Sequence, residues 1–358
     1  MFLGVCAASW KKRGCMTHER KGFITGSEAV VIVTRGALIE SEHLVCYAIV
    51  DGGGRVLQSR GDIDRLVYMR SSAKPLIATA VVASGAADRF SFSSEEIALA
   101  AASHSGEPKH VEAALQMLAK AGLEENALRC GAHAPIYEPA AEALCAAGQL
   151  PRAIHNNCSG KHAGILALSM HRGADPAGYL AADHPAQREI LDVCSRLLDL
   201  PLERMGIGVD GCGIPVIAVP LRTAAHFFAK LSEPDRFPRD LVPALRRVIA
   251  AMIEHPDYVA GSKRFDTDLM TVAKPDVLAK GGAEGYHASA ALKRGLGMTV
   301  KVADGNYRAV APIVIDRMQD LGILDQARVS ALASYRVPKV RNHAGLVVGE
   351  IRVLDGSK

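Results

Sequence analysis

Ala29-Val30-Val31-Ile32-Val33-Thr34 is a run of mostly β-branched residues, a composition typical of a β-strand. A second apolar run, residues 42–50, follows it. The turn Asp51-Gly52-Gly53-Gly54 separates this second run from residues 55–59. Because two apolar runs joined by a glycine-rich turn favour a β-hairpin, we expect the first part of the fold to be a sheet.

The middle of the chain has a different periodicity. Between about residues 72 and 255, apolar residues recur at the spacing of α-helices, for example over 94–100 and 110–121. Strand-like sequence returns at 298–303 and 346–354. Because strands and helices occur in separate runs, the sequence predicts an α+β fold. One sheet is built from both chain ends, and a mostly helical region is inserted between them.

This pattern also predicts the domain boundaries. We expect a single domain over residues 28–358, with its sheet formed by about 28–70 and 290–358. The helical region is expected from about 71 to 289.

Residues 1–27 carry none of this pattern, and we expect a disordered leader there, with Met16 as an alternative start. The first ten residues are largely apolar, but no basic residue precedes them, so a secretory signal is not expected. The eight cysteines are scattered along a long chain, which favours free thiols in a reducing compartment. We therefore expect a cytoplasmic protein.

The charge balance does not favour a polyanionic partner. Lys and Arg number 42 against 38 Asp and Glu, and no basic run or ladder of aromatic residues accompanies the net charge of +4. We therefore expect a small-molecule substrate and no nucleic acid. The longest strongly apolar stretch, residues 75–87, is too short to span a membrane, so no membrane partner is expected.

Five segments contain residues that could carry chemistry. In the first, Ser71 and Lys74 are three residues apart and face the same side of a helix. A neutral, partly buried lysine can take the proton of a serine hydroxyl and so activate it as a nucleophile. The same spacing also occurs when a serine near a helix start is followed by a solvated lysine.

The second and third segments are ambiguous when taken alone. Ser103-His104-Ser105-Gly106 is a serine cluster that is equally typical of a turn or a helix cap. Lys280-Gly281-Gly282 would let a ligand approach the backbone closely, but it is equally typical of a loop with an exposed lysine.

The fourth segment is Asn156-Asn157-Cys158-Ser159-Gly160-Lys161-His162, directly before an apolar run that predicts a helix. A helix N-terminus favours anions and lowers the pKa of a cysteine there. The fifth segment, Asp210-Gly211-Cys212-Gly213, is a glycine-rich turn. Cys158, Lys161 and Cys212 could bind zinc, with Asp210 close by, although two buried inert cysteines would give the same spacing.

Together, and in this order, the five segments resemble the Rhizobium-type (class 3) L-asparaginases, over residues from about 28 to the C-terminus. The resemblance implies a fold like that of the serine β-lactamases, the penicillin-binding proteins and the bacterial glutaminases. It implies hydrolysis of L-asparagine to L-aspartate and ammonia, with zinc as the cofactor. It also implies a homodimer.

The resemblance assigns the catalytic roles to two serine–lysine pairs. Ser71 and Lys74 form the first pair, and Ser103 and Lys280 form the second. Lys263 is the alternative to Lys280. On this basis we expect neutral Lys74 to activate Ser71 for attack on the side-chain amide, while the second pair relays protons to the leaving ammonia.

The remaining implied residues concern zinc and substrate. Cys158, Lys161 and Cys212 are implied as zinc ligands, with a water as the fourth ligand. A second set is implied to bind the substrate or to support the residues that do: Arg70, His162 and Asp210.

Three other functions are compatible with these residues. A glutaminase differs only by one methylene in its substrate. A β-lactamase would share the first serine–lysine spacing, but Ser103-His104-Ser105 lacks the asparagine of S-x-N and Lys280-Gly281-Gly282 stands in place of K-T-G. A non-enzymatic zinc- or redox-responsive binding protein would use Cys158 and Cys212 without needing Ser71.

Overall fold

The computed structural model describes residues 25–26 and 28–354, so nearly all of the expected leader, including Met16, lies outside the described residues. The strands are β1 (Ala29–Arg35), β2 (Leu38–Asp51), β3 (Val56–Arg60), β4 (Leu66–Tyr68), β5 (Gly206–Val209), β6 (Pro215–Pro220), β7 (Val277–Gly282), β8 (Tyr286–Ala291), β9 (Leu296–Val302), β10 (Lys339–Arg341) and β11 (Val347–Leu354).

Most of the helices lie between β4 and β7, and the last three follow β9. They are α1 (Lys74–Ala83), α2 (Ala86–Arg89), α3 (Ser94–Ala100), α4 (Pro108–Lys120), α5 (Glu138–Ala146), α6 (Ser159–His171), α7 (Pro185–Leu198), α8 (Leu221–Lys230), α9 (Val242–Glu254), α10 (Pro256–Val259), α11 (Phe265–Val272), α12 (Val310–Asp320), α13 (Gln326–Ala331) and α14 (Ala333–Arg336).

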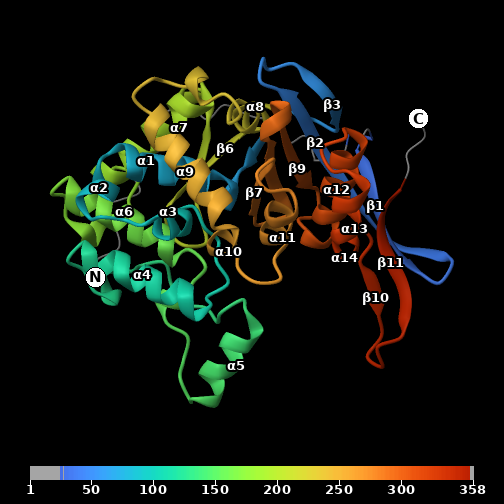
Figure 1. The fold of residues 1–358 in the computed structure, drawn as a ribbon, viewed down its shortest axis with the longest axis horizontal. Coiled ribbons are helices and arrows are strands. Elements are labelled where there is room, and N and C mark those ends of the chain that lie inside the picture. Colours follow the sequence, from blue (N-terminus) through green and yellow to red (C-terminus); the bar gives the residue numbers. More distant parts are fainter. Residues whose placement is uncertain (1–24, 27, 355–358) are drawn as a thin grey trace, which may run out of the picture.

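The larger sheet joins both ends of the described chain. Its strand order is β10-β11-β1-β2-β9-β8-β7, and every pairing is antiparallel. The long strand β2 pairs with β1 along its first half and with β3 along its second half, while β9 lies on its other side. The expected α+β fold, with a sheet from both chain ends and a helical insert, is confirmed (Figure 1).

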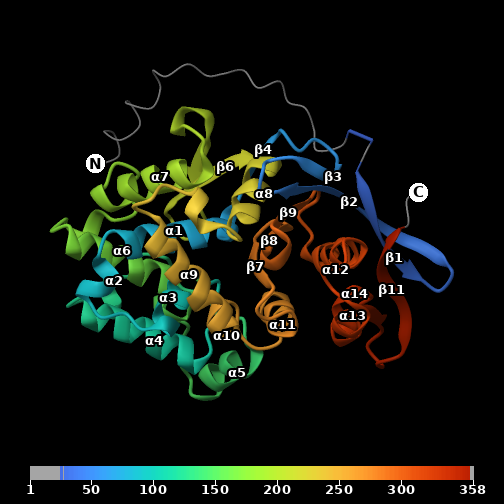
Figure 2. The same ribbon diagram turned by 45° about the horizontal axis from the view of Figure 1, so that its top comes forward.

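Helix α1 is the centre of the helical region. It packs against α6, α7 and α9, and its residues from Lys74 to Val82 are all buried. A helix that is apolar all round can be stable only inside a core, and this one also has a proline in its first turn, where no N–H is needed. Figure 2 shows α1 surrounded by other helices, away from the β10–β11 end of the sheet.

The expected boundary of the helical region is wrong at its C-terminal end. Strands β7 and β8 belong to the larger sheet, yet β7 lies wholly within residues 71–289 and β8 begins within them. Both strands are buried along their whole length, so neither shows the apolar–polar alternation of a half-exposed strand. Gly281 and Gly282 also have low strand propensity, which the antiparallel pairing with β8 overrides.

The second sheet was not expected. It is three-stranded, with order β4-β6-β5, and two of its strands also come from within residues 71–289. β5 and β6 flank the predicted turn around Cys212, and their pairing brings that turn next to β4 and the start of α1. Within the described part of the chain, no helix has the length and apolarity needed to cross a membrane.

Candidate active site

Lys74 is the first residue of α1, and its amine lies in the core with 1% of the residue exposed. The Nζ atom donates to the carbonyl oxygen of Ala102 at 2.6 Å. It also lies 2.9 Å from the Ser103 hydroxyl and 3.2 Å from the Cys158 sulfur. The first lysine of the predicted pairs therefore contacts the serine of the second pair.

Lys280 reaches the same hydroxyl from the opposite element. It lies on β7 and is 1% exposed, and its Nζ is 2.9 Å from the Ser103 hydroxyl and 2.8 Å from the Gly281 carbonyl oxygen. The alternative reading of this segment as a loop with an exposed lysine is wrong, because strand pairing buries the side chain. Lys263, by contrast, is exposed.

Ser103 is thus held between two buried amines. Burial lowers the pKa of Lys280 to about 7, with Asp266 opposing the shift and the charges of Lys74 and Arg264 reinforcing it. Burial also lowers the pKa of Lys74, against the attraction of the Cys158 sulfur. A lysine with a pKa near 7 is neutral in about half of the molecules at neutral pH and can accept a proton there.

Asp266 and His287 support Lys280, and neither was found by sequence reasoning. One carboxylate oxygen of Asp266 accepts the Gly281 N–H at 2.6 Å and lies 4.0 Å from Lys280 Nζ. The other lies 3.2 Å from His287 Nε2. Both residues are buried, but they come from α11 and β8, so no sequence spacing links them to Lys280.

Ser71 lies in a short 3-10 helix, Arg70–Ala73, immediately before α1. Its side chain is half-buried, and among the described residues it makes no hydrogen bond. Arg70 has a φ of +51°, a backbone conformation that is costly for a residue with a side chain and is common at functional sites. Ser72 is buried instead and donates to the Lys280 carbonyl oxygen at 2.6 Å, which ties this turn to β7.

Two of the predicted zinc ligands come from α6 and one comes from the turn between β5 and β6. Cys158 directly precedes α6, and Lys161 is the third residue of the helix. Lys161 Nζ is 2.9 Å from the Cys212 sulfur, and the Cys158 and Cys212 thiols are hydrogen-bonded to each other. All three residues are at most 5% exposed.

The charges of this cluster depend on one another. The hydrogen bond from Cys212 lowers the pKa of Cys158, and Lys161 and Lys74 add to this effect against the cost of burial. The same hydrogen bond, together with burial, raises the pKa of Cys212. Burial disfavours the Lys161 ammonium, but the two sulfurs outweigh it and raise the pKa of Lys161.

The cluster fits a zinc ion in its donor atoms. Two sulfurs and one amine nitrogen converge from separate elements, and three protein donors leave one position open, as in catalytic zinc sites. Among the described residues, no three His, Cys, Asp or Glu side chains form a metal-binding group, so a site here requires Lys161 as a neutral ligand.

Arg70 and Asp210 form an ion pair beside this cluster. Arg70 Nε lies 2.7 Å from one carboxylate oxygen of Asp210, and the other oxygen is 3.6 Å from the Cys212 sulfur. Burial acts to raise the pKa of Asp210, but Lys161 and Arg70 outweigh it and the pKa is lowered. Behind these residues lies a cavity of about 20 Å³, which holds about one water and is too small for an amino acid.

His162 is placed differently from Arg70 and Asp210. It is fully buried on α6, and its Nδ1 lies 2.7 Å from the Tyr179 hydroxyl. The two rings meet edge to face. Burial and the charges of Lys161 and Lys74 hold the pKa of His162 well below its usual value. In this structure, therefore, the side chain of His162 contacts Tyr179 in the core.

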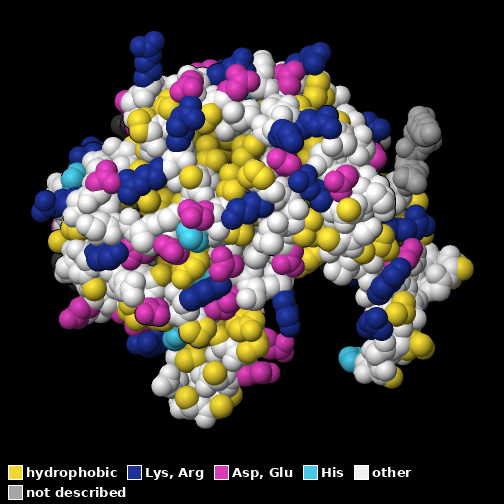
Figure 3. Space-filling model, in the orientation of Figure 1, with side chains coloured by type: hydrophobic (Ala, Val, Ile, Leu, Met, Phe, Trp, Pro, Cys, Tyr) yellow, Lys and Arg dark blue, Asp and Glu magenta, His cyan; other side chains and the backbone are white. Residues whose placement is uncertain are grey.

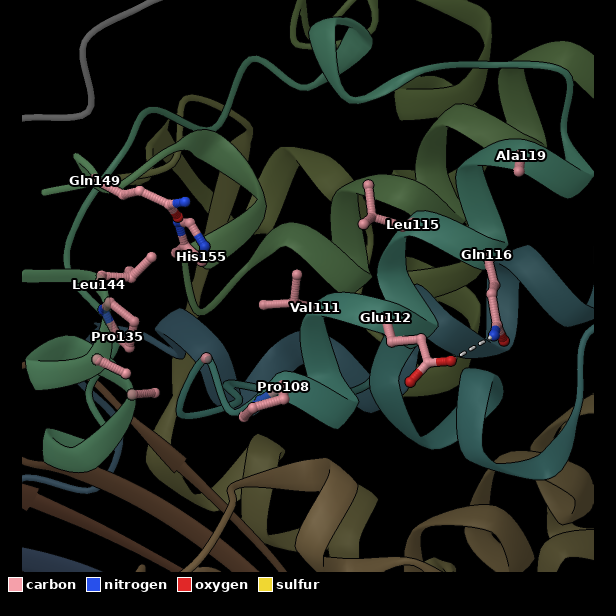
Figure 4. A pocket seen from close by; sticks show the side chains of 13 residues that line it. Pro108, Val111, Glu112, Leu115, Gln116, Ala119, Pro135, Leu144, Gln149 and His155 are labelled. Atoms are coloured by element: carbon pink, nitrogen blue, oxygen red, sulfur yellow. Dashed lines mark hydrogen bonds between the residues drawn. The ribbon is translucent and has the colours of Figure 1, made fainter. Parts of the chain in front are cut away.

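A separate pocket lies away from these residues. It has a volume of about 650 Å³, and Figure 4 shows Pro108, Val111 and Leu115 of α4 facing Leu144 of α5 across it. Hydrophobic side chains also gather over the α5 projection in Figure 3. The lining includes none of the predicted catalytic residues.

Comparisons with known proteins give a family. The model of the L-asparaginase II family matches residues 31–353, whereas no curated protein matches the chain. Similar solved structures include one described as Mglu, with 18% identity over 78% of this chain and 67% of that chain, and a TM-score of 0.35. Mglu in its L-glutamate binding form has 18% identity over 80% of this chain and 61% of that chain, and a TM-score of 0.37.

A β-lactamase from Mycobacterium bovis is also similar, with 14% identity over 82% of this chain and 95% of that chain, and a TM-score of 0.39. The chain spans about two thirds of the length of the Mglu structures that it matches. Because the family model covers nearly all of the described sequence, the chain belongs to the L-asparaginase II family of amidohydrolases.

Proposed function

We propose that this protein hydrolyses L-asparagine to L-aspartate and ammonia by acyl transfer through a serine. The observation that carries the proposal is the Ser103 hydroxyl, which lies 2.9 Å from both Lys74 Nζ and Lys280 Nζ. Two buried amines on one hydroxyl can move a proton between them. Membership of the L-asparaginase II family supports an amide as the bond that is cleaved.

Ser71 is the proposed nucleophile. It is half-buried with an unengaged hydroxyl, whereas Ser103 is 7% exposed and already contacts both lysines. A nucleophile must meet the carbonyl carbon of the substrate, so the more accessible serine is the better candidate. The three-residue spacing also keeps Ser71 within one helical turn of Lys74.

The reaction then proceeds through an ester. Neutral Lys74 takes the proton of Ser71 as its oxygen bonds to the side-chain amide carbon, and backbone N–H groups stabilise the oxyanion. The C–N bond breaks as a proton passes through Ser103 to the leaving nitrogen, which departs as ammonia. Water next attacks the β-aspartyl ester, giving L-aspartate and returning the proton to Ser71.

Zinc is part of the proposal. Cys158, Lys161 and Cys212 would hold it, and the convergence of their donor atoms supports this set. A bound zinc would orient and polarise the substrate. Ser71 supplies the nucleophile, so the ion has no need to generate one.

L-Asparagine is the proposed substrate, and L-glutamine is the nearest competitor. One extra methylene changes binding by only about 1–3 kcal/mol, so we expect some glutaminase side activity. A homodimer in the cytoplasm completes the proposal and rests on the resemblance and on the scattered cysteines.

Ammonia release from L-asparagine and from L-glutamine tests the reaction, using zinc-loaded protein and the Ser71→Ala variant. We expect release that favours asparagine and falls roughly 10,000-fold in the variant. Release that persists in Ser71→Ala would assign the nucleophile to another residue, with Ser103 the next candidate. No release from either amide would refute the amidohydrolase proposal and favour a zinc- or redox-responsive binding protein that uses Cys158 and Cys212.

A further inference from the structure

Arg264 is a cation close to the proposed catalytic centre, and no described residue serves as its anionic partner. Its side chain is half-buried at the start of α11, and within the described residues it forms no ion pair with a carboxylate. The one hydrogen bond that its side chain makes to this part of the chain runs from Nη1 to the Ser105 hydroxyl at 3.4 Å. A guanidinium has five N–H donors, so most of the donors of Arg264 remain available.

The other cations of the site are already engaged. Arg70 is paired with Asp210 at 2.7 Å, and Lys161 contacts the Cys212 sulfur at 2.9 Å. Lys74 and Lys280 both contact Ser103.

The segment that carries Arg264 is fastened to the loop of Ser103. The Ser103 N–H donates to the Val259 carbonyl oxygen at 2.9 Å, and the Ser105 hydroxyl donates to the Ala260 carbonyl oxygen at 2.7 Å. Because the Ser105 proton is used in this way, its oxygen is free to accept from Arg264. The position of Arg264 is therefore fixed relative to the proposed proton relay.

The carboxylate of Glu107 binds the next part of the same segment, at Ser262. It accepts the Ser262 N–H at 2.6 Å and the Ser262 hydroxyl at 3.1 Å. Gly261 has a φ of +107°, and a Cβ there would lie 2.6 Å from both Glu107 and Ser105, so only glycine fits. Lys263 follows with a φ of +56°. A strained, tightly bonded segment that ends in an unpaired cation is typical of a ligand-binding position.

We propose that Arg264 binds the α-carboxylate of the substrate, and that Ser105 and Glu107 position it for this contact. The inference rests on the proposed function, because it names the part of asparagine that the site would recognise. Asparagine carries an α-carboxylate that needs a cationic partner once it leaves water, and a guanidinium can bind both carboxylate oxygens at once. The charge of Arg264 also acts on the proposed catalytic centre, because it contributes to lowering the pKa of Lys280 and of His104.

The test compares ligands that differ only in this group. L-Asparagine and its α-carboxamide, L-asparaginamide, are compared as substrates. L-Aspartate and its α-amide, L-isoasparagine, are compared in binding by calorimetry. In zinc-loaded wild-type protein we expect the carboxylate ligand of each pair to be preferred by about 10- to 100-fold, the range typical of a charge-assisted hydrogen bond.

Arg264→Gln should abolish this preference by raising KM for L-asparagine while leaving KM for L-asparaginamide unchanged. Lys263→Gln is the matched control, since it removes the neighbouring exposed charge and should keep the preference. Arg264→Lys should restore part of it. Loss of a residue with a purely structural role would weaken the binding of both ligands of a pair equally. The ratio of the two affinities, or of the two KM values, therefore separates a structural role from carboxylate binding.

An unchanged preference in Arg264→Gln would overturn the inference, and so would wild-type protein that does not distinguish the carboxylate from the amide in binding. Failure of the proposed function gives a different result. In that case no ammonia is released from L-asparagine, while the calorimetric comparison still decides whether Arg264 binds a carboxylate.

Discussion

The amine of Lys74 lies 2.9 Å from the hydroxyl of Ser103, a residue that follows it by 29 positions. Within the described residues, this amine makes no hydrogen bond to the hydroxyl of Ser71, which lies one turn before it. The first serine–lysine pair of the sequence is therefore linked to the second in space. Because Lys280 completes the contact from β7, protonation of one amine affects the other through a single oxygen.

This linkage predicts a large effect of Ser103→Ala. Without the hydroxyl, neither amine can deliver its proton to the leaving nitrogen, and we expect kcat with L-asparagine to fall by roughly 100- to 10,000-fold. Steady-state kinetics would measure it. Ser72→Ala is a suitable control because, among the described residues, its hydroxyl is hydrogen-bonded to the Lys280 carbonyl oxygen and to neither amine. Equal losses in the two variants would argue against a relay.

The rate should depend on pH through Lys280. Burial lowers the pKa of this lysine to about 7. The proposed relay needs Lys280 neutral, so that its amine can accept a proton from the Ser103 hydroxyl that it shares with Lys74. Activity is therefore lost as the pH falls below 7 and rises as the pH increases through 7. A profile of kcat/KM against pH would show this acid limb. A flat profile, or one that favours acid, would contradict a lysine base.

Asp266→Asn should move that limb. The Asp266 carboxylate favours the charged form of Lys280 and lies 4.0 Å from its Nζ, so removing the charge should lower the pKa of Lys280 further. The acid limb is then expected at lower pH. Asp268→Asn is the control on the same helix, since its carboxylate contacts the Tyr335 hydroxyl instead. A shift to higher pH would be inconsistent with this electrostatic role.

Zinc content should depend on the two buried thiols. We expect Cys158→Ser and Cys212→Ser each to lower the zinc retained after dialysis, measured by elemental analysis, because a hydroxyl is a poor zinc ligand. Cys145→Ser removes an exposed cysteine of α5 and should change nothing. Equal zinc in all three variants would exclude this cluster as the metal site.

Two glycines of α6 should respond differently to alanine. A Cβ at Gly160 would lie 2.7 Å from the Leu99 carbonyl oxygen, whereas at Gly164 the nearest atom is 3.4 Å away. We expect Gly160→Ala to cost about 1–3 kcal/mol of the free energy of unfolding through overpacking. Gly164→Ala should be neutral or stabilise by up to about 1 kcal/mol, because alanine favours helix. Urea denaturation would measure both, and a similar loss in each would count against close packing of α6 on Leu99.

The sequence predicted the overall arrangement because its strands and helices are segregated. It did not predict β7 as a strand, since a fully buried strand rich in alanine and glycine shows no alternation, and Lys280 within it resembles a loop lysine. The three-stranded sheet was missed for a related reason, because β5 and β6 flank a turn that dominates the local pattern.

For the site, each local motif was ambiguous on its own. The resemblance supplied the serines, lysines and cysteines as a set, but it did not show which of them are in contact. The contact of Lys74 with Ser103 depends on how α1 packs, and the support of Lys280 by Asp266 joins two separate elements. Arg264 was not recognised at all. Its significance lies in the absence of a carboxylate partner among the described residues, and sequence cannot show which charges are paired.

The measurement that tests the central claim most directly is the capture of the ester intermediate. Zinc-loaded protein is mixed with L-asparagine, quenched in acid within the first turnover and mapped by peptide mass spectrometry. The account predicts a β-aspartyl adduct on Ser71 that disappears when the reaction is allowed to finish. An adduct on Ser103 or Cys158, or ammonia release without any adduct, would contradict it.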